Sequence, residues 1–307
     1  MLFNNIDNNN KIIVIFIVPI LFTKVFNQNY SSEITITITG DGEQKILSSD
    51  TECGGEASFD TLPDKIFING EPLDYVGKTV NILSSNENNI TMKWNNSLKN
   101  CNVMFRSLKN IIKIDFSKFD TSQVTDMGCM FLGCDKLTSL DLSYFNTSSV
   151  KRMESMFDDC KLLTSLNLQN FDTSNVITMQ SMFWGCKGLK SLDLSNFNTS
   201  KVTNMKSMFN SCSGLLSLNL DNFDTSLVNN MVTMFKGCSS LKSLNLYSFD
   251  TSNLQTYNDI FSGCDSLSSY CINNEKNSIL ENLLDNYLYN CSNYDNNNLE
   301  EEEEEEE

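Results

Sequence analysis

The chain has 307 residues, which is enough for one or two domains with a sizeable core. Its formal net charge is −17. Eight of these negative charges come from a C-terminal run of glutamates, residues 300–307, so the rest of the chain is only moderately acidic. No basic stripe is visible along the sequence, so we expect no nucleic-acid partner. The chain contains no histidine, which excludes Ser-His-Asp and Cys-His catalysis and every metal site that uses histidine.

The N-terminal segment is typical of a targeting signal. An apolar run of eleven residues, Ile12 to Phe22, follows Lys11 and ends before Thr23 and Lys24. This run is too short to cross a bilayer as a helix, but it suits the hydrophobic part of a signal peptide. No pair of small residues marks a cleavage site, so an uncleaved signal anchor and a short buried strand or helix remain alternatives. We expect residues 1–30 to be a signal peptide or signal anchor, and the protein to be secreted or cell-surface.

The middle of the chain is built from a 26-residue repeat. Phenylalanine recurs at this period at Phe119, Phe145, Phe171, Phe197, Phe223 and Phe249. Cysteine recurs at the same period at Cys134, Cys160, Cys186, Cys212, Cys238 and Cys264. Six clear units and one degenerate unit at the start cover residues 98–272. A fixed period of this length predicts a solenoid of stacked coils.

Two periods alternate within each unit. Leu137, Leu140 and Leu142 alternate with outward positions, as in a short strand. Earlier in the unit, apolar side chains recur at the spacing of one helical stripe, at Val124, Met127, Met130 and Phe131. Ser122, or Thr121 beside it, stands at the expected N-cap, and Gly133 stands just past the expected helix end. The expected fold class is a repeat solenoid of the α/β leucine-rich-repeat type, with one short strand and one short helix per coil.

A lone unit cannot bury its apolar face, so the units must stack and both ends of the stack need covers. Alternating strand patterns predict that residues 31–97 form a β-rich N-terminal cap or small domain. Residues 98–272 are expected to form the solenoid. A helical pattern that starts at Ser278 then predicts a C-terminal helical cap within residues 273–295. Residues 296–307 are expected to form an acidic disordered tail.

The repeated string Phe-Asp-Thr-Ser-x-Val-x-x-Met-x-x-Met-Phe-x-Gly-Cys-x-x-Leu-x-x-Leu-x-Leu closely resembles the BspA-type leucine-rich repeats. These occur in surface lipoproteins of mycoplasmas and in many bacterial and protist surface proteins. The resemblance covers residues 98–272 and implies a right-handed repeat solenoid that is exposed outside the cell. It also implies adhesion or interaction with host and matrix in some members. It implies no catalytic residues, because the shared motif is structural, and it does not reach residues 33–97.

The six repeated cysteines predict a buried structural ladder. Equivalent atoms of stacked coils lie about 4.8 Å apart with parallel side chains, whereas a disulfide needs Cβ atoms about 3.8 Å apart. A chain of disulfides or a metal wire is therefore disfavoured, and cysteine is a good small buried residue. Outside this column, Cys271 and Cys291 flank the predicted capping helix, and Cys101 and Cys129 occupy nearby positions in adjacent units. These are the two candidate disulfides, and free thiols are the alternative.

The outward residues of the strands are the candidate recognition face. The first outward column contains Ser139, Ser165, Ser191, Ser217 and Ser243. The second contains Asp141, Asn167, Asp193, Asn219 and Asn245. The third and most varied contains Ser143, Gln169, Ser195, Asp221 and Tyr247. Variation on a regular scaffold permits recognition, and a plain solvated face is the alternative reading.

Each repeat also carries an Asp/Asn-Thr-Ser corner. Its hydroxyls are expected to cap the helix and to bond the corner backbone, in preference to binding ice or glycans. Asp and Asn mostly alternate just before these hydroxyls, which relieves carboxylate repulsion, with a calcium site as the alternative. Six sequons are candidate glycosylation sites in a eukaryotic secretory pathway: Asn29, Asn89, Asn95, Asn146, Asn198 and Asn290.

These patterns indicate a secreted or cell-surface binding or adhesion module that uses the repeats as a recognition surface. The alternative is a structural coat or spacer protein without a specific ligand. A carbohydrate-active enzyme is less favoured, because Asp141 and Asp193 lie two coils apart, roughly 10 Å, at the edge of the range for an inverting pair. No cofactor or metal is expected. The expected partner is a protein or glycan at the cell surface or in the matrix, without membrane insertion beyond an N-terminal anchor.

Overall fold

The computed structural model describes residues 29–53, 56–57, 59–84, 86–273 and 276–284. It also describes the backbone of β1 (Asn5–Ile6) and β2 (Ile12–Ile13), which pair antiparallel. Most of the predicted signal segment and all of the predicted acidic tail lie outside the described residues. From Ser31 onward the chain forms one compact unit.

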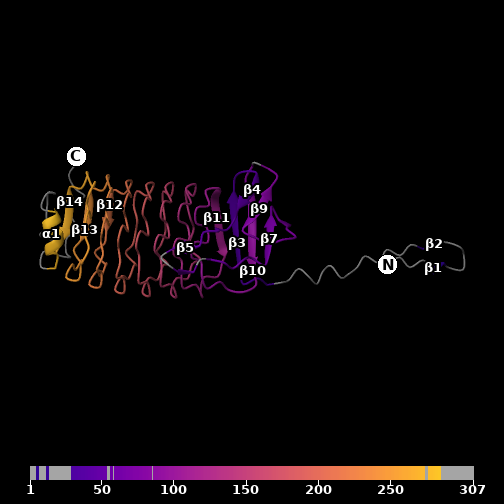
Figure 1. Ribbon diagram of the computed structural model, residues 1–307, viewed down its shortest axis with the longest axis horizontal. Helices are drawn as coiled ribbons and strands as arrows, with labels where there is room; N and C mark the ends of the chain where they lie inside the picture. Colours follow the sequence, from indigo (N-terminus) through magenta and orange to yellow (C-terminus); the bar gives the residue numbers. More distant parts are fainter. Residues whose placement is uncertain are drawn as a thin grey trace, which may run out of the picture. The chain divides into compact units, whose positions relative to one another are not determined.

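An antiparallel sheet of five strands stands at one end of this unit (Figure 1). Alternate residues of its strands are buried, because large apolar side chains alternate there with threonine, asparagine and lysine. In spatial order the strands are β11 (Ile111–Lys118), β3 (Ser32–Ile38), β10 (Asn88–Trp94), β7 (Lys65–Ile68) and β8 (Glu71–Pro72). Two smaller antiparallel pairs are β4 (Gly42–Lys45) with β9 (Thr79–Ile82), and β5 (Glu52–Cys53) with β6 (Glu56–Ala57).

Strand β11 belongs both to this sheet and to the repeat. It pairs antiparallel with β3. Its buried side chains Ile111, Ile114 and Phe116 stand one full repeat before Leu137, Leu140 and Leu142 of the first clear unit. The N-terminal sheet and the repeats therefore share a strand, and their apolar side chains form one continuous core.

The repeats form a row of stacked coils between β11 and helix α1 (Ser278–Leu284) (Figure 1). Parallel bridges join equivalent residues in every pair of neighbouring coils, beginning with Asn100↔Asp126. The prediction of a strand in every coil is only partly confirmed. Strands are present in the last three coils as β12 (Ser217–Asn219), β13 (Ser243–Leu246) and β14 (Ser269–Ile272), but the equivalent segments around Leu140, Leu166 and Leu192 in the three preceding coils form no strand. The three strands pair in parallel, with Leu218 opposite Leu244. The coils thus stack in the register of the sequence repeat.

The prediction of a short helix in each coil is wrong. In its place the backbone makes a series of tight turns, in which Met130 N–H donates to Met127 C=O, and Cys134 N–H to Phe131 C=O. The N–H groups of alternate residues point out of the coil and donate to the next one. Cys129 N–H bonds Glu154 C=O at 2.8 Å, for example. We call this segment the turn ladder, defined by residues 126–134 and their equivalents in the other coils.

The turn ladder depends on two backbone positions per coil with positive φ. The first is occupied mostly by residues other than glycine, at Cys129, Ser155, Ser181, Ser207, Thr233 and Asp259, with φ between 52° and 58°. The second is glycine in four coils, at Gly133, Gly185, Gly237 and Gly263. The glycines that suggested a helix C-cap are therefore turn residues, which adopt this conformation without steric cost.

The interior of the stack contains ladders of identical apolar side chains. The rings of Phe131, Phe157, Phe183, Phe209, Phe235 and Phe261 stack with successive centroids 5.6–5.8 Å apart and nearly parallel planes. The methionine, valine and leucine columns beside them are also buried. Each side chain packs on its own counterpart in the next coil, so stability becomes a nearest-neighbour property.

The corner threonines tie neighbouring coils together. Thr173 Oγ1 donates to Asn198 C=O at 3.0 Å and accepts from Asn198 N–H at 2.8 Å. Thr147 makes the same two bonds to Asp172. The following serine donates its N–H to the corner side chain, as Ser174 does to Asp172 Oδ1. These groups bond corner backbone, as expected, but they cap no helix.

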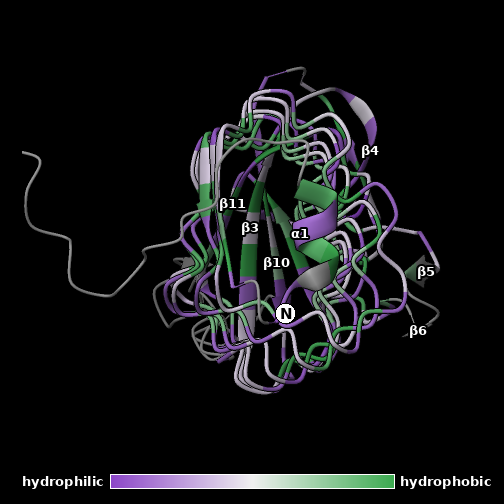
Figure 2. Cartoon of the chain, turned by 90° about the vertical axis from the view of Figure 1, so that its left-hand side faces the viewer, coloured by the Kyte–Doolittle hydropathy of each residue, from purple (hydrophilic) through white to green (hydrophobic). Residues whose placement is uncertain are grey.

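The stack ends beneath helix α1, which lies over the interior of the coils when they are viewed along the stack (Figure 2). Its Leu280 and Leu284 are buried. The segment before the helix is placed like the corner of a further coil. Lys276 C=O accepts a hydrogen bond from Thr251 Oγ1, as corner backbone elsewhere in the stack does from the threonine of the preceding coil. The predicted helical cap lay within residues 273–295, and the positions after Leu284 lie outside the described residues. Of the helices described, none is both long and apolar enough to cross a membrane.

We predict that Thr173→Val lowers the free energy of unfolding by about 2 kcal/mol, because Asn198 N–H and C=O lose the buried Thr173 hydroxyl that bonds both of them. Chemical denaturation followed by circular dichroism measures this change. Thr138→Val is the matched control. Thr138 is exposed, and it bonds the next coil through its backbone carbonyl, which valine retains. We therefore expect the free energy of unfolding of this control to change by less than about 0.5 kcal/mol. Equal losses in the two variants would contradict a bridging role for the corner hydroxyl.

Candidate functional site

The outward side chains of the strand segments form one surface, which we call the strand face. The structure brings the three predicted columns together in neighbouring coils, with Ser217 opposite Ser243 and Asn219 opposite Asn245. All fifteen predicted residues are exposed or half-buried. The columns also continue into the N-terminal sheet, because Lys113 stands one full repeat before Ser139 on the exposed side of β11.

Three shallow hollows lie along the strand face. The first, of about 480 Å³, is lined by Thr35, Thr37, Asn69, Gly70, Asn89, Thr91, Lys113 and Asp115. The second, of about 510 Å³, is lined by Ser139, Leu140, Asp141, Ser165, Leu166, Asn167, Leu168, Gln169, Ser191 and Asp193. The third, of about 310 Å³, is lined by Ser217, Leu218, Asn219, Ser243, Leu244, Asn245, Ser269, Tyr270 and Cys271. Polar atoms dominate the lining of the first hollow, whereas apolar atoms make up more than half of the exposed lining of the second and third, where leucines lie between the serines and asparagines.

The second column of the strand face also has a local structural role. Asp141 Oδ1 accepts the N–H of Ser143 at 3.0 Å, and Asp193 Oδ1 accepts the N–H of Ser195 at 3.0 Å. These serine hydrogen bonds lower the pKa of both carboxyl groups. A general acid needs a raised pKa, so the geometry does not favour the carboxylate pair as an acid catalyst. The second oxygen of each carboxylate remains available at the surface, apart from a 3.3 Å bond from Gln169 to Asp193 Oδ2.

The column cysteines form a ladder of free, buried thiols. Each Sγ donates to the carbonyl of a phenylalanine in the preceding coil, as Cys212 does to Phe183 at 2.9 Å and Cys238 to Phe209 at 3.0 Å. Burial raises the pKa of the Cys212 thiol to about 12. Such a thiol is neutral and unreactive at physiological pH. Among the described residues there is no cluster of metal-ligating side chains.

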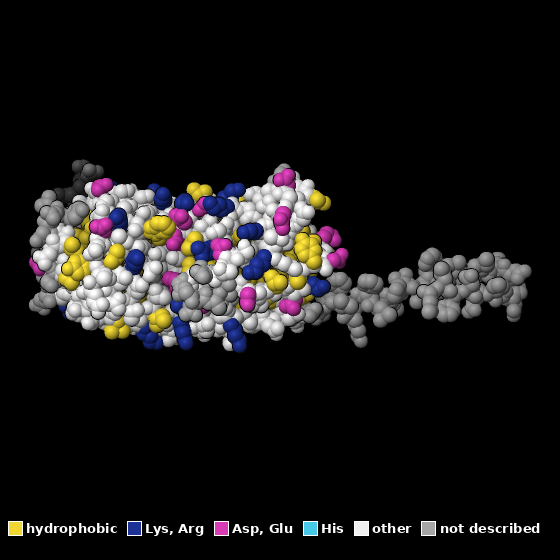
Figure 3. All heavy atoms as spheres, viewed as in Figure 1, with side chains coloured by type: hydrophobic (Ala, Val, Ile, Leu, Met, Phe, Trp, Pro, Cys, Tyr) yellow, Lys and Arg dark blue, Asp and Glu magenta, His cyan; other side chains and the backbone are white. Residues whose placement is uncertain are grey.

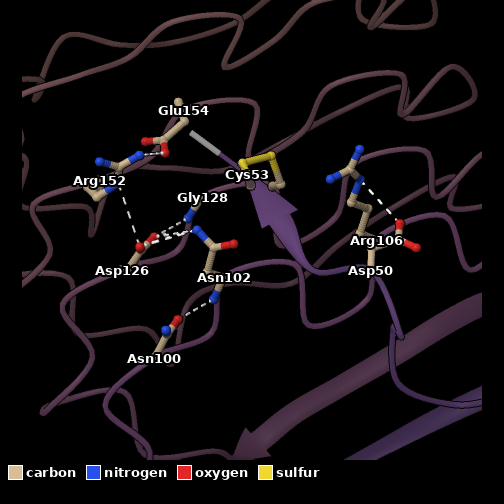
Figure 4. Close-up of a disulfide and its surroundings, with 10 residues drawn as sticks. Asp50, Cys53, Asn100, Asn102, Arg106, Asp126, Gly128, Arg152 and Glu154 are labelled. Atoms are coloured by element: carbon tan, nitrogen blue, oxygen red, sulfur yellow. Dashed lines mark hydrogen bonds and ion pairs between the residues drawn. A yellow bond between two sulfur atoms is a disulfide. The ribbon is translucent and has the colours of Figure 1, made fainter. Parts of the chain in front are cut away.

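The predicted pairing of Cys101 with Cys129 is wrong. Cys129 is bonded to Cys53, which lies 76 residues earlier, on β5. Cys101 is a buried free thiol. The β5–β6 segment comes back over the turn ladder, and the disulfide fastens it there (Figure 4). Cys271 is disulfide-bonded, and its predicted partner Cys291 lies outside the described residues.

A buried polar network lies beside this disulfide (Figure 4). Asp126 accepts from Asn102 Nδ2 at 3.2 Å and pairs with Arg152 at 3.6 Å, while Arg152 also bonds Glu154. Burial raises the pKa of Glu154. A Cβ at Gly128 would come within 3.0 Å of Asn102 Nδ2 and Glu154 Oε1. Because Gly128 has no side chain, the Asn102 and Glu154 side chains can both lie against its Cα.

Sequence reasoning missed this network, although the sequence contains a signal for it. Gly128 occupies a position that is Glu154, Gln180 and Lys206 in the next three units. A lone glycine in a column of long side chains indicates that neighbouring side chains fill its place. Cys129 likewise occupies a position that is serine in the next three units. Its partner lies outside the repeats, so no comparison between repeats finds it.

The sequons fall on exposed asparagines where the structure describes them, at Asn29, Asn89, Asn95, Asn146 and Asn198. Asn290 lies outside the described residues. Asn146 and Asn198 stand on the corner edge, where each accepts the N–H of the serine two residues later through Oδ1. Glycan attachment at Nδ2 would leave that bond in place.

We predict that a thiol map of the unreduced protein yields a cross-linked peptide pair containing Cys53 and Cys129. Cys101 and the six column cysteines should react with an alkylating reagent only after denaturation, because all seven are buried. Digestion and mass spectrometry measure both results. In Cys53→Ser, the cross-link should disappear, and Cys129 should be alkylated after denaturation without a reductant. A peptide that links Cys101 to Cys129 would contradict the structure.

Comparison with known proteins adds three findings. The family described as "Mycoplasma protein of unknown function, DUF285" matches residues 78–191, 159–274 and 186–299. A leucine-rich repeat protein from Bacteroides ovatus is similar to the chain, with 16% sequence identity and a TM-score of 0.21. That similarity covers 70% of this chain and 71% of the other. No curated protein matches the sequence.

Proposed function

From the premise that this chain belongs to the DUF285 family of mycoplasma-type proteins, with repeats of the BspA-like leucine-rich kind, we propose that it is a binding module. In this proposal the protein is secreted or displayed at the cell surface, and its strand face recognises a protein or glycan. The proposal rests on one observation above others. Three exposed columns of mostly polar side chains run along the strand face, and three separate hollows lie on this face between the N-terminal sheet and the last coils.

The chemistry of the strand face indicates the kind of partner. The first column offers serine hydroxyls at regular intervals, and the second offers alternating carboxylate and amide groups. The third column varies from Ser143 and Gln169 to Asp221 and Tyr247, while the core columns behind it are uniform. A small, polar and mildly acidic surface suits a cationic or hydroxyl-rich partner, and Tyr247, which is 45% exposed, supplies an aromatic contact.

The remaining parts of the chain fit this role. We propose that the N-terminal sheet and helix α1 are caps that close the two ends of the solenoid, because each packs against a terminal coil. We propose that residues 1–30 direct the chain out of the cell as a signal peptide or anchor. The last twelve residues remain, in our proposal, a solvated acidic tail. No cofactor enters the proposed function.

A structural coat or spacer protein without a specific ligand is the second candidate. The observation that favours it is the same regularity, because a plain solvated face also consists of serine, asparagine and aspartate. An enzyme of the carbohydrate-active class is the third. The lowered pKa values of Asp141 and Asp193 disfavour it, because an inverting hydrolase needs one carboxylic acid that remains protonated.

We predict saturable binding of the purified protein to cells or to arrayed glycans, and its loss when Asp141→Asn, Asp193→Asn and Tyr247→Ser are combined. The introduced residue types already occupy equivalent positions in other coils, so the variant keeps the fold and changes only the charge and the ring. Titration by flow cytometry or on arrays measures the binding, and an affinity loss of at least about tenfold is expected if the three contacts lie in the interface.

Asp74→Asn, Tyr75→Ser and Asp265→Asn form the matched control, because these exposed residues have the same chemistry and lie outside the three columns. The control variant should bind like the natural protein. Binding that does not saturate, or that is insensitive to the strand-face variant, would instead favour the coat protein.

We predict that the natural protein has a processed N-terminus near residues 23–31 and carries glycans on exposed sequons such as Asn146 if it matures in a eukaryotic secretory pathway. Mass spectrometry of the protein isolated from its source measures both features. An intact Met1 with unmodified asparagines and fully reduced cysteines would contradict the extracellular location, and with it the adhesion role.

A further inference from the structure

One edge of the stack collects lysines that are far apart in the sequence. We call it the tight-turn edge, and it consists of residues 109–112, 135–138, 161–164, 187–190, 213–216, 239–242 and 265–268. It lies between the turn ladder and the strand face, on the side of β4, because Asn110 bonds Gln44 there. Six lysines occupy it, at Lys109, Lys136, Lys161, Lys187, Lys190 and Lys242. Figure 3 shows basic side chains along this upper rim of the stack.

The tight-turn edge is positive although the whole chain is strongly negative. Its six lysines face two carboxylates within the edge, Asp135 and Asp265. Asp135 lies 3.7 Å from Lys109 and 3.5 Å from Lys161, and Asp159, just outside the edge, lies 3.3 Å from Lys161. Four lysines make no ion pair with any described residue and are exposed, at Lys136, Lys187, Lys190 and Lys242. No basic stripe is visible in the linear sequence, because folding alone places these lysines in a row.

Two leucines protrude among the lysines. Leu162 is 53% exposed and Leu216 is 46% exposed, although almost all other leucines of the repeat are buried. Leu162 directly follows Lys161, and Leu216 lies one coil beyond Lys190 in the same column. Glycine at 188 and 214 holds the turns close to the preceding coil, since a Cβ there would collide with backbone carbonyls. The lysine and leucine side chains therefore project into solvent from a turn backbone that packs closely on the preceding coil.

The shape of the edge favours a flat partner over an enveloping one. Equivalent turns of neighbouring coils follow one another about 5 Å apart, so the tight turns form a row along one side of the stack and their exposed side chains point to that side. An anionic bilayer presents such a plane, with charge at its surface for the lysines and apolar chains beneath for the leucines. A single-stranded nucleic acid needs exposed aromatic rings for stacking, and the tight-turn edge contains none.

We propose that the tight-turn edge docks the protein onto anionic lipid surfaces, with Lys136, Lys187, Lys190 and Lys242 at the headgroups. Leu162 and Leu216 enter the boundary between headgroups and acyl chains. This interaction goes beyond the proposed recognition by the strand face, because the two surfaces are different sides of each coil. A protein docked in this way keeps the strand face free for its partner.

Co-sedimentation of the full-length protein with vesicles tests this proposal. Vesicles of phosphatidylcholine alone are compared with vesicles that also contain phosphatidylglycerol. We expect stronger partitioning onto the anionic vesicles, which weakens as salt is added. Replacing the four lysines that make no ion pair by glutamine should lower the partition coefficient by roughly 600-fold at most, since each lysine near an anionic surface contributes a factor of about five.

The matched control replaces Lys99, Lys151, Lys201 and Lys206 by glutamine, which changes the net charge equally at exposed positions away from this edge. The control variant should retain most of the binding. A second variant, Leu162→Ser with Leu216→Ser, should weaken the part of the binding that persists at high salt. Circular dichroism and thermal unfolding establish that all variants fold, and the unchanged N-terminal segment contributes equally to each.

Equal loss in the two lysine variants would overturn the proposal, because it would show a response to net charge rather than to the edge. Binding that is independent of phosphatidylglycerol would overturn it too. Edge-dependent binding to heparin without binding to anionic vesicles would replace the lipid by a sulfated polysaccharide. Strand-face variants should leave vesicle binding unchanged, so failure of this proposal is distinguishable from failure of the proposed recognition role.

Discussion

The backbone hydrogen bonds between turn ladders are the interaction on which the other features depend. In each coil the N–H groups of alternate turn residues donate to carbonyls of the next coil, as Phe183 does to Met208 at 2.9 Å. To aim these groups outward, the chain adopts positive φ at residues such as Ser181 and Ser207, which is unfavourable for a residue with a side chain. An isolated coil would have to adopt this unfavourable backbone conformation without forming the hydrogen bonds to a neighbouring coil. The conformation is stable only where a neighbouring coil accepts the hydrogen bonds, so the local structure and the stack form together.

This requirement explains the uniformity of the interior columns. When one coil sits directly above another, each buried side chain meets its own counterpart, so identical shapes pack best. The parallel phenylalanine rings are one result, and the thiols that bond phenylalanine carbonyls of the preceding coil are another. Threonine is the matching solution at the corner, because one hydroxyl bonds both the N–H and the C=O of the next coil. A change at any of these positions disturbs two interfaces, one on each side of the coil.

The sequence predicts those features that depend on the repeat, and it misleads where a local pattern has two physical explanations. The period, the buried columns, the parallel register and the exposed strand face were all predictable, because each follows from stacking one unit directly on the next. The absence of a helix was not predictable from this pattern. Apolar residues at the spacing of Val124, Met127 and Met130 are buried on one side of a helix, but they are also buried in a series of tight turns. The partner of Cys129 was not predictable, because Cys53 lies outside the repeats. The tight-turn edge was missed for a related reason: its lysines occupy different positions in different units, and only the stack gathers them.

The same constraint separates the parts of the chain that maintain the fold from those that are free to act on other molecules. Interior and corner positions are bound to their counterparts, so a change there affects stability first. On the strand face and on the tight-turn edge the backbone bonds the neighbouring coil, as Leu216 N–H does to Lys190 C=O, but many side chains point into solvent, so their identity can differ from unit to unit at little cost. Gln169, Asp221 and Tyr247 differ in this way on the strand face, and Leu162, Lys190 and Lys242 do so on the tight-turn edge. Function in this architecture is therefore expected where the repeat is least regular and the side chain most exposed, on two adjoining sides of the stack.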